Sequence, residues 1–88
     1  MAREMNTMLV LYKDGKEKNF ERFFTKSFKS IVRMYKDTLS KGGAFVDYFF
    51  KEYWDADKVV VYATPDHYTR GEILYSSSGE EFMKMISK

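Results

Sequence analysis

The chain has 88 residues, a formal net charge of +2 and an aromatic fraction of 18%, so we expect a single domain spanning residues 1–88. The absence of cysteine excludes a disulfide framework, a zinc finger and a thiol nucleophile. No segment approaches the roughly 18–20 apolar residues of a membrane span, and nothing at the N-terminus resembles a signal peptide, so we expect a cytoplasmic protein.

The charges are unevenly distributed along the chain. Residues 1–41 carry an excess of lysine and arginine, and residues 42–88 carry an excess of aspartate and glutamate. Such an asymmetry suggests an acidic or phosphate-bearing partner for the first half. Two alternatives stay open, because the halves could instead attract each other within one fold or between the subunits of a homo-oligomer.

The first predicted elements are two strands. The segment Asn6 to Lys13 reads as a strand with apolar residues on both of its faces, which is typical of a strand in the middle of a sheet. Asp14-Gly15 is a strong signal for a two-residue hairpin turn. We expect the returning strand, Lys16 to Lys18, to be short, charged and at the sheet edge.

A long amphipathic helix is predicted over Phe20 to Lys41, with Asn19 as its N-cap and Gly42-Gly43 ending it. At 3.6 residues per turn its residues separate into two opposed faces. The apolar face consists of Phe20, Phe23, Phe24, Phe28, Ile31, Val32, Tyr35 and Leu39. The opposite face carries a basic stripe of Arg22, Lys26, Lys29, Arg33 and Lys36.

The second half predicts two helices and two strands. Ala44 to Trp54 suits a helix by the three-four spacing of its apolar residues, although its aromatic residues would also suit a strand. The β-branched run Lys58 to Ala63 predicts a buried strand, and Glu72 to Ser76 predicts a strand antiparallel to it. Ser78 to Glu81 is a capping box that opens a short final helix.

The predicted order is therefore β-β-α-α-β-β-α, which indicates the α+β class. We expect a small antiparallel or mixed sheet of about four strands. The long amphipathic helix and one or two shorter helices are expected to pack on one face of this sheet, leaving the basic stripe in solvent.

The basic stripe is the main functional signal. Its five cations repel one another unless water or a counter-charge screens them, and RNA or an acidic protein surface would supply that charge. The alternative is an ordinary solvated helix face. Among the exposed aromatic candidates, Trp54 is the one we expect at an interface.

Catalytic chemistry has one weak candidate, the turn around His67, the single histidine of the chain. Asp66, Tyr68 and Arg70 are its neighbours, and together they could cleave RNA by acid–base catalysis. The second titrating group expected of a nuclease is missing unless a tyrosine or a lysine takes that role. Asp55 and Asp57 are weak metal ligands, so we expect no catalytic residues, no metal and no cofactor.

Two resemblances bear on function. The order of elements looks like that of small RelE-type messenger ribonucleases, which implies an RNA-cleaving site with Tyr68, Arg70, Tyr75 and Lys84 as candidates. A compact, cysteine-free, aromatic-rich chain with a charged face also resembles the small early proteins of T4-like phages, many of which block a host enzyme or a toxin–antitoxin nuclease.

We therefore predict a small non-enzymatic binding protein whose basic helix face docks RNA or an acidic protein surface. Its most concrete form is a phage-type inhibitor of a host toxin or defence nuclease. The alternatives are a RelE-like ribonuclease and a structural homo-oligomer assembled through complementary charged halves.

Overall fold

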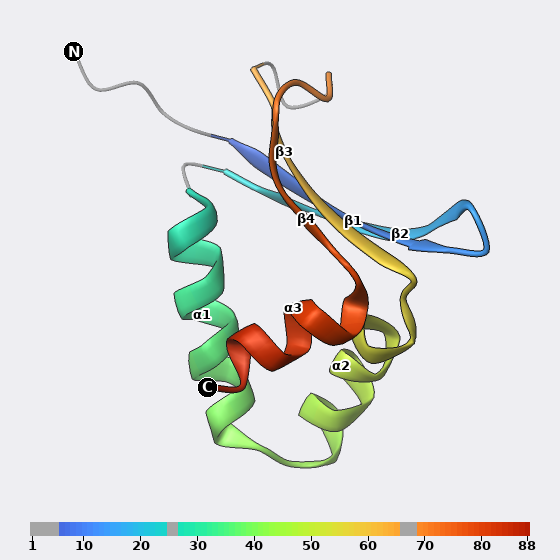
Figure 1. The fold of residues 1–88 in the computed structure, drawn as a ribbon. Coiled ribbons are helices and arrows are strands. Elements are labelled where there is room, and N and C mark those ends of the chain that lie inside the picture. Colours follow the sequence, from blue (N-terminus) through green and yellow to red (C-terminus); the bar gives the residue numbers. More distant parts are fainter. Residues whose placement is uncertain (1–5, 25–26, 66–68) are drawn as a thin grey trace.

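A computed structural model describes residues 6–24, 27–65 and 69–88. Figure 1 shows four strands and three helices in the predicted order, which confirms the α+β class. The elements are β1 (Thr7–Lys13), β2 (Lys16–Phe23), α1 (Phe28–Lys41), α2 (Ala44–Asp55), β3 (Lys58–Ala63), β4 (Ile73–Ser77) and α3 (Gly79–Ile86).

The four strands form one antiparallel sheet in the order β2-β1-β3-β4. Strand β1 lies inside the sheet and is buried on both faces, as predicted from the apolar residues on its two faces. The hairpin between β1 and β2 turns at Asp14 and Gly15, which have φ angles of 54° and 77°. Positive φ at both positions is the requirement of a type I′ turn, and it explains why Asp-Gly occurs there.

All three helices lie on one side of the sheet (Figure 1), as predicted. The core forms where Leu9 of β1 and Val61 of β3 meet the helices. Tyr35 of α1 lies at its centre, and the rings of five neighbouring aromatic residues contact it edge-on. Its hydroxyl pairs with that of Tyr53 at 2.7 Å, and burial raises the pKa of both groups. Both hydroxyls therefore stay protonated at neutral pH.

The predicted boundary between the second strand and the long helix is wrong. Strand β2 continues to Phe23, well beyond the predicted end at Lys18, and Asn19 lies within this strand instead of capping a helix. The reason is β1, whose seven residues need hydrogen-bonding partners on both sides. Strand β3 supplies one side, and a three-residue β2 would leave most of the other side unpaired.

Helix α1 begins at Phe28 instead of Phe20. Its N-cap is Ser27, whose hydroxyl accepts a hydrogen bond from the Ser30 amide at 3.2 Å. The helix ends at Gly42, as predicted, because positive φ angles at Gly42 and Gly43 turn the chain toward α2. The segment that precedes α1 belongs to the sheet, so the amphipathic helix is shorter than predicted.

Helices α2 and α3 form as predicted. The segment that suited either a helix or a strand is helical, and it buries Val46, Phe50 and Tyr53. Helix α3 opens with the predicted capping box, in which the Ser78 hydroxyl accepts from the Glu81 amide at 3.1 Å. These two helices pack against each other at the start of α3, below the sheet in the view of Figure 1.

Candidate functional site

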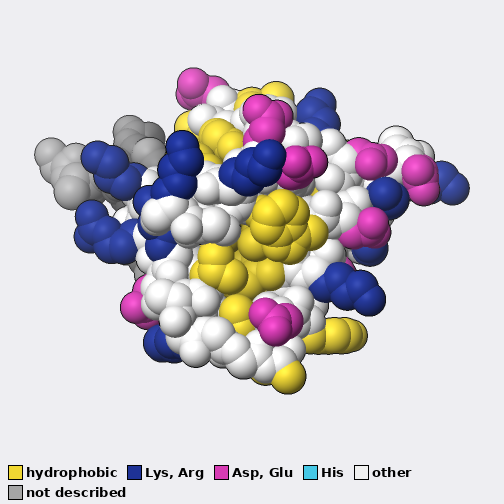
Figure 2. All heavy atoms as spheres, turned by 60° about the horizontal axis from the view of Figure 1, so that its bottom comes forward, with side chains coloured by type: hydrophobic (Ala, Val, Ile, Leu, Met, Phe, Trp, Pro, Cys, Tyr) yellow, Lys and Arg dark blue, Asp and Glu magenta, His cyan; other side chains and the backbone are white. Residues whose placement is uncertain are grey.

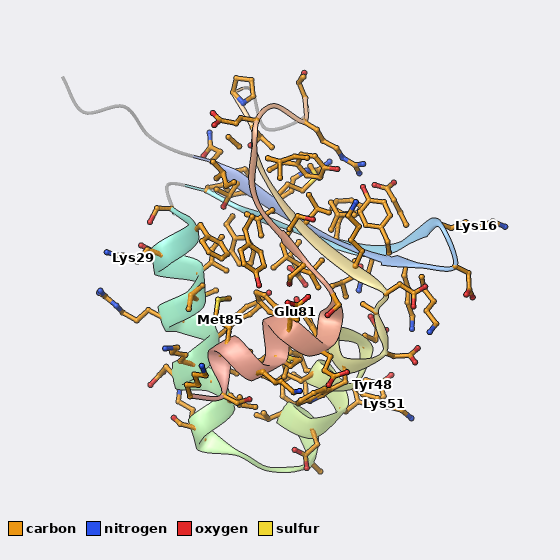
Figure 3. All side chains as sticks on the ribbon, viewed as in Figure 1. Lys16, Lys29, Tyr48, Lys51, Glu81 and Met85 are labelled. Carbon is orange, nitrogen blue, oxygen red and sulfur yellow. The ribbon has the colours of Figure 1, made fainter. Side chains whose placement is uncertain are left out.

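Three residues of the predicted basic stripe lie on the exposed side of α1, and we call them the cationic face: Lys29, Arg33 and Lys36. Their spacing of four and three places them along one side of the helix. None of them forms an ion pair with a carboxylate among the described residues. Figure 2 shows lysine and arginine side chains at the left, the side on which α1 lies, and others at the right, and Figure 3 shows Lys29 pointing away from the core.

The other two members of the predicted stripe do not join this face. Arg22 lies on β2 opposite Met8, and its guanidinium lies 5.0 Å from the centre of the Phe20 ring. Met8 is on the side of the sheet away from the helices, so Arg22 and the cationic face lie on different sides of the sheet. Lys26 lies outside the described residues.

Trp54 is exposed, as predicted for an interface residue, but it belongs to a different surface. It lies near the end of α2, where 49% of its side chain remains accessible. It lines a shallow hollow together with Lys18 of β2 and Tyr48 of α2, and no residue of α1 lines this hollow. A ligand on the cationic face would therefore not contact Trp54 through this hollow.

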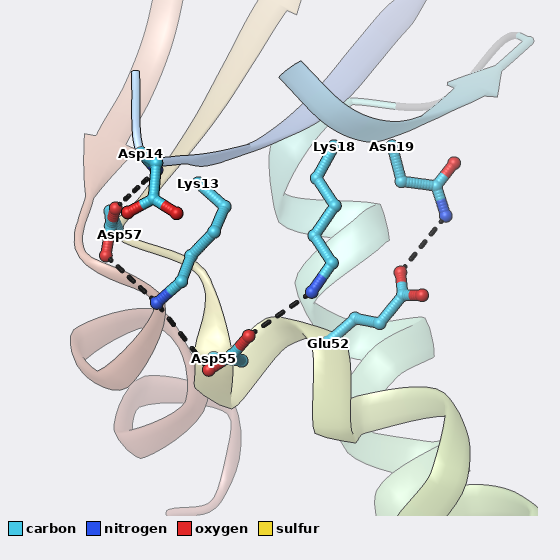
Figure 4. A network of polar contacts seen from close by, with 7 residues as sticks. All are labelled: Lys13, Asp14, Lys18, Asn19, Glu52, Asp55 and Asp57. Carbon is cyan, nitrogen blue, oxygen red and sulfur yellow. Dashed lines mark hydrogen bonds and ion pairs between the residues drawn. The ribbon is translucent and has the colours of Figure 1, made fainter. Parts of the chain in front are cut away.

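Two lysines of the first half pair with acids of the second half in the described part of the chain. Lys13 lies 3.6 Å from Asp55 and 3.5 Å from Asp57, and Lys18 lies 3.3 Å from Asp55 (Figure 4). The hydrogen bond from Lys18 lowers the pKa of Asp55, and the backbone amide of Asp14 lowers that of Asp57. Part of the charge asymmetry is thus satisfied within one fold, in agreement with the intramolecular alternative.

Acid should weaken this corner of the molecule. Because the folded pKa values of Asp55 and Asp57 lie below the ordinary value of 3.8, their pairs stabilise the fold above about pH 4. That stabilisation is lost as the pH falls through the folded pKa values. The urea midpoint should therefore fall from pH 6 to pH 3, and it should fall less in the double variant Asp55→Asn, Asp57→Asn. An equally steep fall in the variant would contradict this assignment.

On the other side of the sheet, two tyrosines and an arginine form a polar cluster. The hydroxyls of Tyr12 and Tyr62 lie 3.1 Å apart, and the Arg70 guanidinium lies 5.5 Å from the Tyr62 ring centre and pairs with Glu17. Burial, followed by the hydrogen bond with Tyr62, raises the pKa of Tyr12 to about 12. The Tyr12 hydroxyl therefore stays protonated at neutral pH and cannot serve as a general base there.

The residues that a RelE-like site would use are not brought together where they are described. Tyr75 stacks on Phe28 on the helix side of the sheet, whereas Arg70 contacts Tyr62 on the opposite side. Lys84 pairs with Glu80 on the exposed surface of α3. The hypothesised catalytic turn around His67, with Asp66 and Tyr68, lies outside the described residues.

A group of three metal-ligating side chains does not occur among residues 6–24, 27–65 and 69–88. The two carboxylates considered as weak metal ligands, Asp55 and Asp57, instead form ion pairs with Lys13 and Lys18. Over the same ranges, no helix has both the length and the apolar character needed to cross a membrane.

Helix α2 carries an exposed aromatic surface that was not predicted from the sequence. Phe45 and Tyr48 are each 77% exposed, although the same helix buries Val46 and Phe50. A helical wheel over Ala44 to Trp54 would have found them, because both project away from the buried stripe at 100° per residue. Apolar side chains on both sides of a helix indicate a surface available to a partner.

Comparison of the chain with protein-family models, curated proteins and solved structures found no match. No function can therefore be transferred from a relative.

Proposed function

We propose that the protein is a non-enzymatic binding protein and that the cationic face of α1 docks RNA. The observation that supports this proposal is the set of three neighbouring exposed cations, none of which has a carboxylate partner in the described part of the chain. Other lysines of the molecule, such as Lys41 and Lys84, have such partners on their own helices.

Like charges at a spacing of four and three along a helix repel one another. This repulsion lowers the stability of α1 slightly, and it is relieved when a partner brings negative charge to the same side of the helix. Lys29 and Lys36 are about 10 Å apart along the helix axis, at 1.5 Å per residue. A polyanion that follows the helix can therefore contact all three side chains together.

RNA is the polyanion that we favour, because its phosphates form a continuous row of charge that lysine and arginine neutralise without a requirement for sequence. An acidic protein surface offers the same sign of charge. In its most concrete form, suggested by the resemblance to small phage early proteins, the protein would act as an inhibitor of a host toxin or defence nuclease, with bound RNA assisting.

The proposal predicts that removal of the cationic face weakens RNA binding. In the triple variant Lys29→Gln, Arg33→Gln, Lys36→Gln, the affinity for a fluorescent single-stranded oligoribonucleotide should fall by about tenfold or more at low salt. For wild type, three phosphate contacts predict a roughly 20-fold loss of affinity between 50 and 200 mM salt. Fluorescence anisotropy across a salt series measures both quantities, and the variant should show the flatter salt dependence.

A matched control removes three positive charges elsewhere: Lys16→Gln, Lys58→Gln, Lys84→Gln. Figure 3 shows Lys16 at the tip of the β1–β2 hairpin, far from Lys29 on α1. This control should bind RNA more tightly than the α1 variant does. If the two variants lost RNA affinity equally, the net charge of the protein and not one particular face would determine binding. The proposal would then fail.

Affinity capture from cell lysate, with and without ribonuclease, distinguishes the two kinds of partner. If the cationic face docks RNA, ribonuclease treatment should remove what the wild-type protein captures. If capture persists after the treatment and still depends on Lys29, Arg33 and Lys36, the face docks an acidic protein surface instead.

A further inference from the structure

A second surface of the molecule combines exposed aromatic rings with acidic side chains. It is a groove of about 280 Å3 between β2 and α2, lined by Asn19, Glu21, Phe45, Tyr48, Phe49, Glu52 and Tyr53. This volume is just below the roughly 300–1,000 Å3 of typical small-molecule sites, so the groove suits a single long side chain.

The groove is acidic. Its lining contains two carboxylates, Glu21 and Glu52, and no lysine or arginine. Glu52 accepts a hydrogen bond from the side-chain amide of Asn19 at 3.3 Å, which ties α2 to β2 at this point (Figure 4). Neither carboxylate forms an ion pair with a cation in the described part of the chain. The charge of the groove is therefore uncompensated.

The aromatic walls favour a cation as well. Phe45 and Tyr48 each leave 77% of their surface accessible, and Tyr53 closes the groove from the buried side. The face of an aromatic ring attracts a cation, and a flat guanidinium can stack on it. Arginine also matches a carboxylate with two parallel hydrogen bonds, so it fits this groove better than lysine.

The shallow hollow lined by Trp54, which adjoins this groove, does not favour a cation in the same way. It shares Tyr48 and Glu52 with the groove, but Lys18 and Lys51 also line it. Lys18 already pairs with Asp55 across this hollow (Figure 4). The two lysines of this hollow balance its two carboxylates, Glu52 and Asp55, whereas the groove has two carboxylates and no cation. The charges therefore direct a basic ligand to the side of Tyr48 where Glu21 and Phe45 lie.

We propose that the groove between β2 and α2 binds an arginine side chain presented by an exposed basic segment of another protein. Glu21 and Glu52 pair with the guanidinium, and Phe45 and Tyr48 hold it by stacking. The site is separate from the cationic face of α1 and has the opposite charge, so this proposal does not depend on RNA binding.

The test uses the full-length chain and a short fluorescent peptide that carries two arginines in a glycine–serine background. Wild type should bind it saturably in fluorescence anisotropy. Glu21→Gln and Phe45→Ala should each weaken binding by about tenfold. A peptide with citrulline in place of arginine, which keeps the shape and loses the charge, should not bind.

Matched controls are Glu72→Gln and Ile73→Ala, an exposed acid and an exposed apolar residue outside the groove, and both should bind the arginine peptide as wild type does. The triple variant of the cationic face should also keep peptide binding, which separates this test from that of RNA binding. The proposal is overturned by absent binding, by binding that survives both groove substitutions, or by light scattering in which wild type is a dimer and Phe45→Ala is a monomer, since a second copy of the chain would then occupy the groove.

Discussion

Replacing Phe82 by alanine is expected to lower the free energy of unfolding by roughly 3–5 kcal/mol, the range for a fully buried phenylalanine. Phe82 has no accessible surface, and its ring lies 5.7 Å from that of Tyr53 and 6.0 Å from that of Tyr35. The substitution removes the one aromatic ring that α3 contributes to the core and leaves a cavity between helices and sheet. Urea denaturation followed by circular dichroism measures the loss.

Phe45→Ala is the matched control, because it makes the same chemical change at a ring that is 77% exposed. Its free energy of unfolding should stay within about 0.5 kcal/mol of wild type. A loss in Phe45→Ala comparable to that in Phe82→Ala would show that the outer face of α2 is packed, which contradicts the core described here.

Gly79→Ala is expected to destabilise the protein by roughly 3 kcal/mol or more. A Cβ at this position would collide with the backbone carbonyl oxygens of Tyr53, in α2, and of Ala56, the residue that follows this helix. The Gly79 amide also donates a hydrogen bond to the Ala56 carbonyl at 3.1 Å. Backbone atoms cannot move aside as a flexible side chain can, so α3 must shift away from α2.

The loss in Gly79→Ala should appear as a lower urea midpoint with an unchanged slope, because the same surface is exposed on unfolding. Glu80→Ala, one position along the same helix and exposed, serves as the comparison and should change the midpoint far less. If Gly79→Ala had a midpoint equal to or above that of wild type, the close approach of α2 and α3 would be incorrect.

Local signals in the sequence predicted most of the fold. Asp14-Gly15 demands a type I′ turn, and the capping box at Ser78 and Glu81 fixes the start of α3, because both depend on a few adjacent residues. The apolar run Lys58 to Ala63 gave β3 with its observed bounds. Three-four spacing also favoured the helix over the strand for α2, in agreement with the structure.

The start of α1 shows where local signals were insufficient. Phe20, Phe23 and Phe24 fit helical spacing, but pairing with β1 outweighs this preference and extends β2 to Phe23. Ser27 is as good an N-cap as Asn19, so capping alone could not choose between them. Matching the length of β2 to the seven residues of β1 would have favoured Ser27.

The candidate sites depend even more on tertiary structure. Separation of Arg22 from Lys29, Arg33 and Lys36 follows from the strand–helix boundary, and no residue pattern within the stripe reveals it. The groove of Glu21 and Phe45 joins two segments that are more than twenty residues apart in the sequence. Neither its acidity nor its shape can be deduced before β2 and α2 are placed side by side.

RNA docking on the cationic face of α1 can be followed residue by residue through the amide chemical shifts of the 15N-labelled protein during titration with a single-stranded oligoribonucleotide. If RNA docks on this face, the largest shift changes fall between residues 29 and 36 and disappear at high salt. Changes centred on the opposite side of the sheet, around Phe20 and Arg22, or no changes at all, would contradict it.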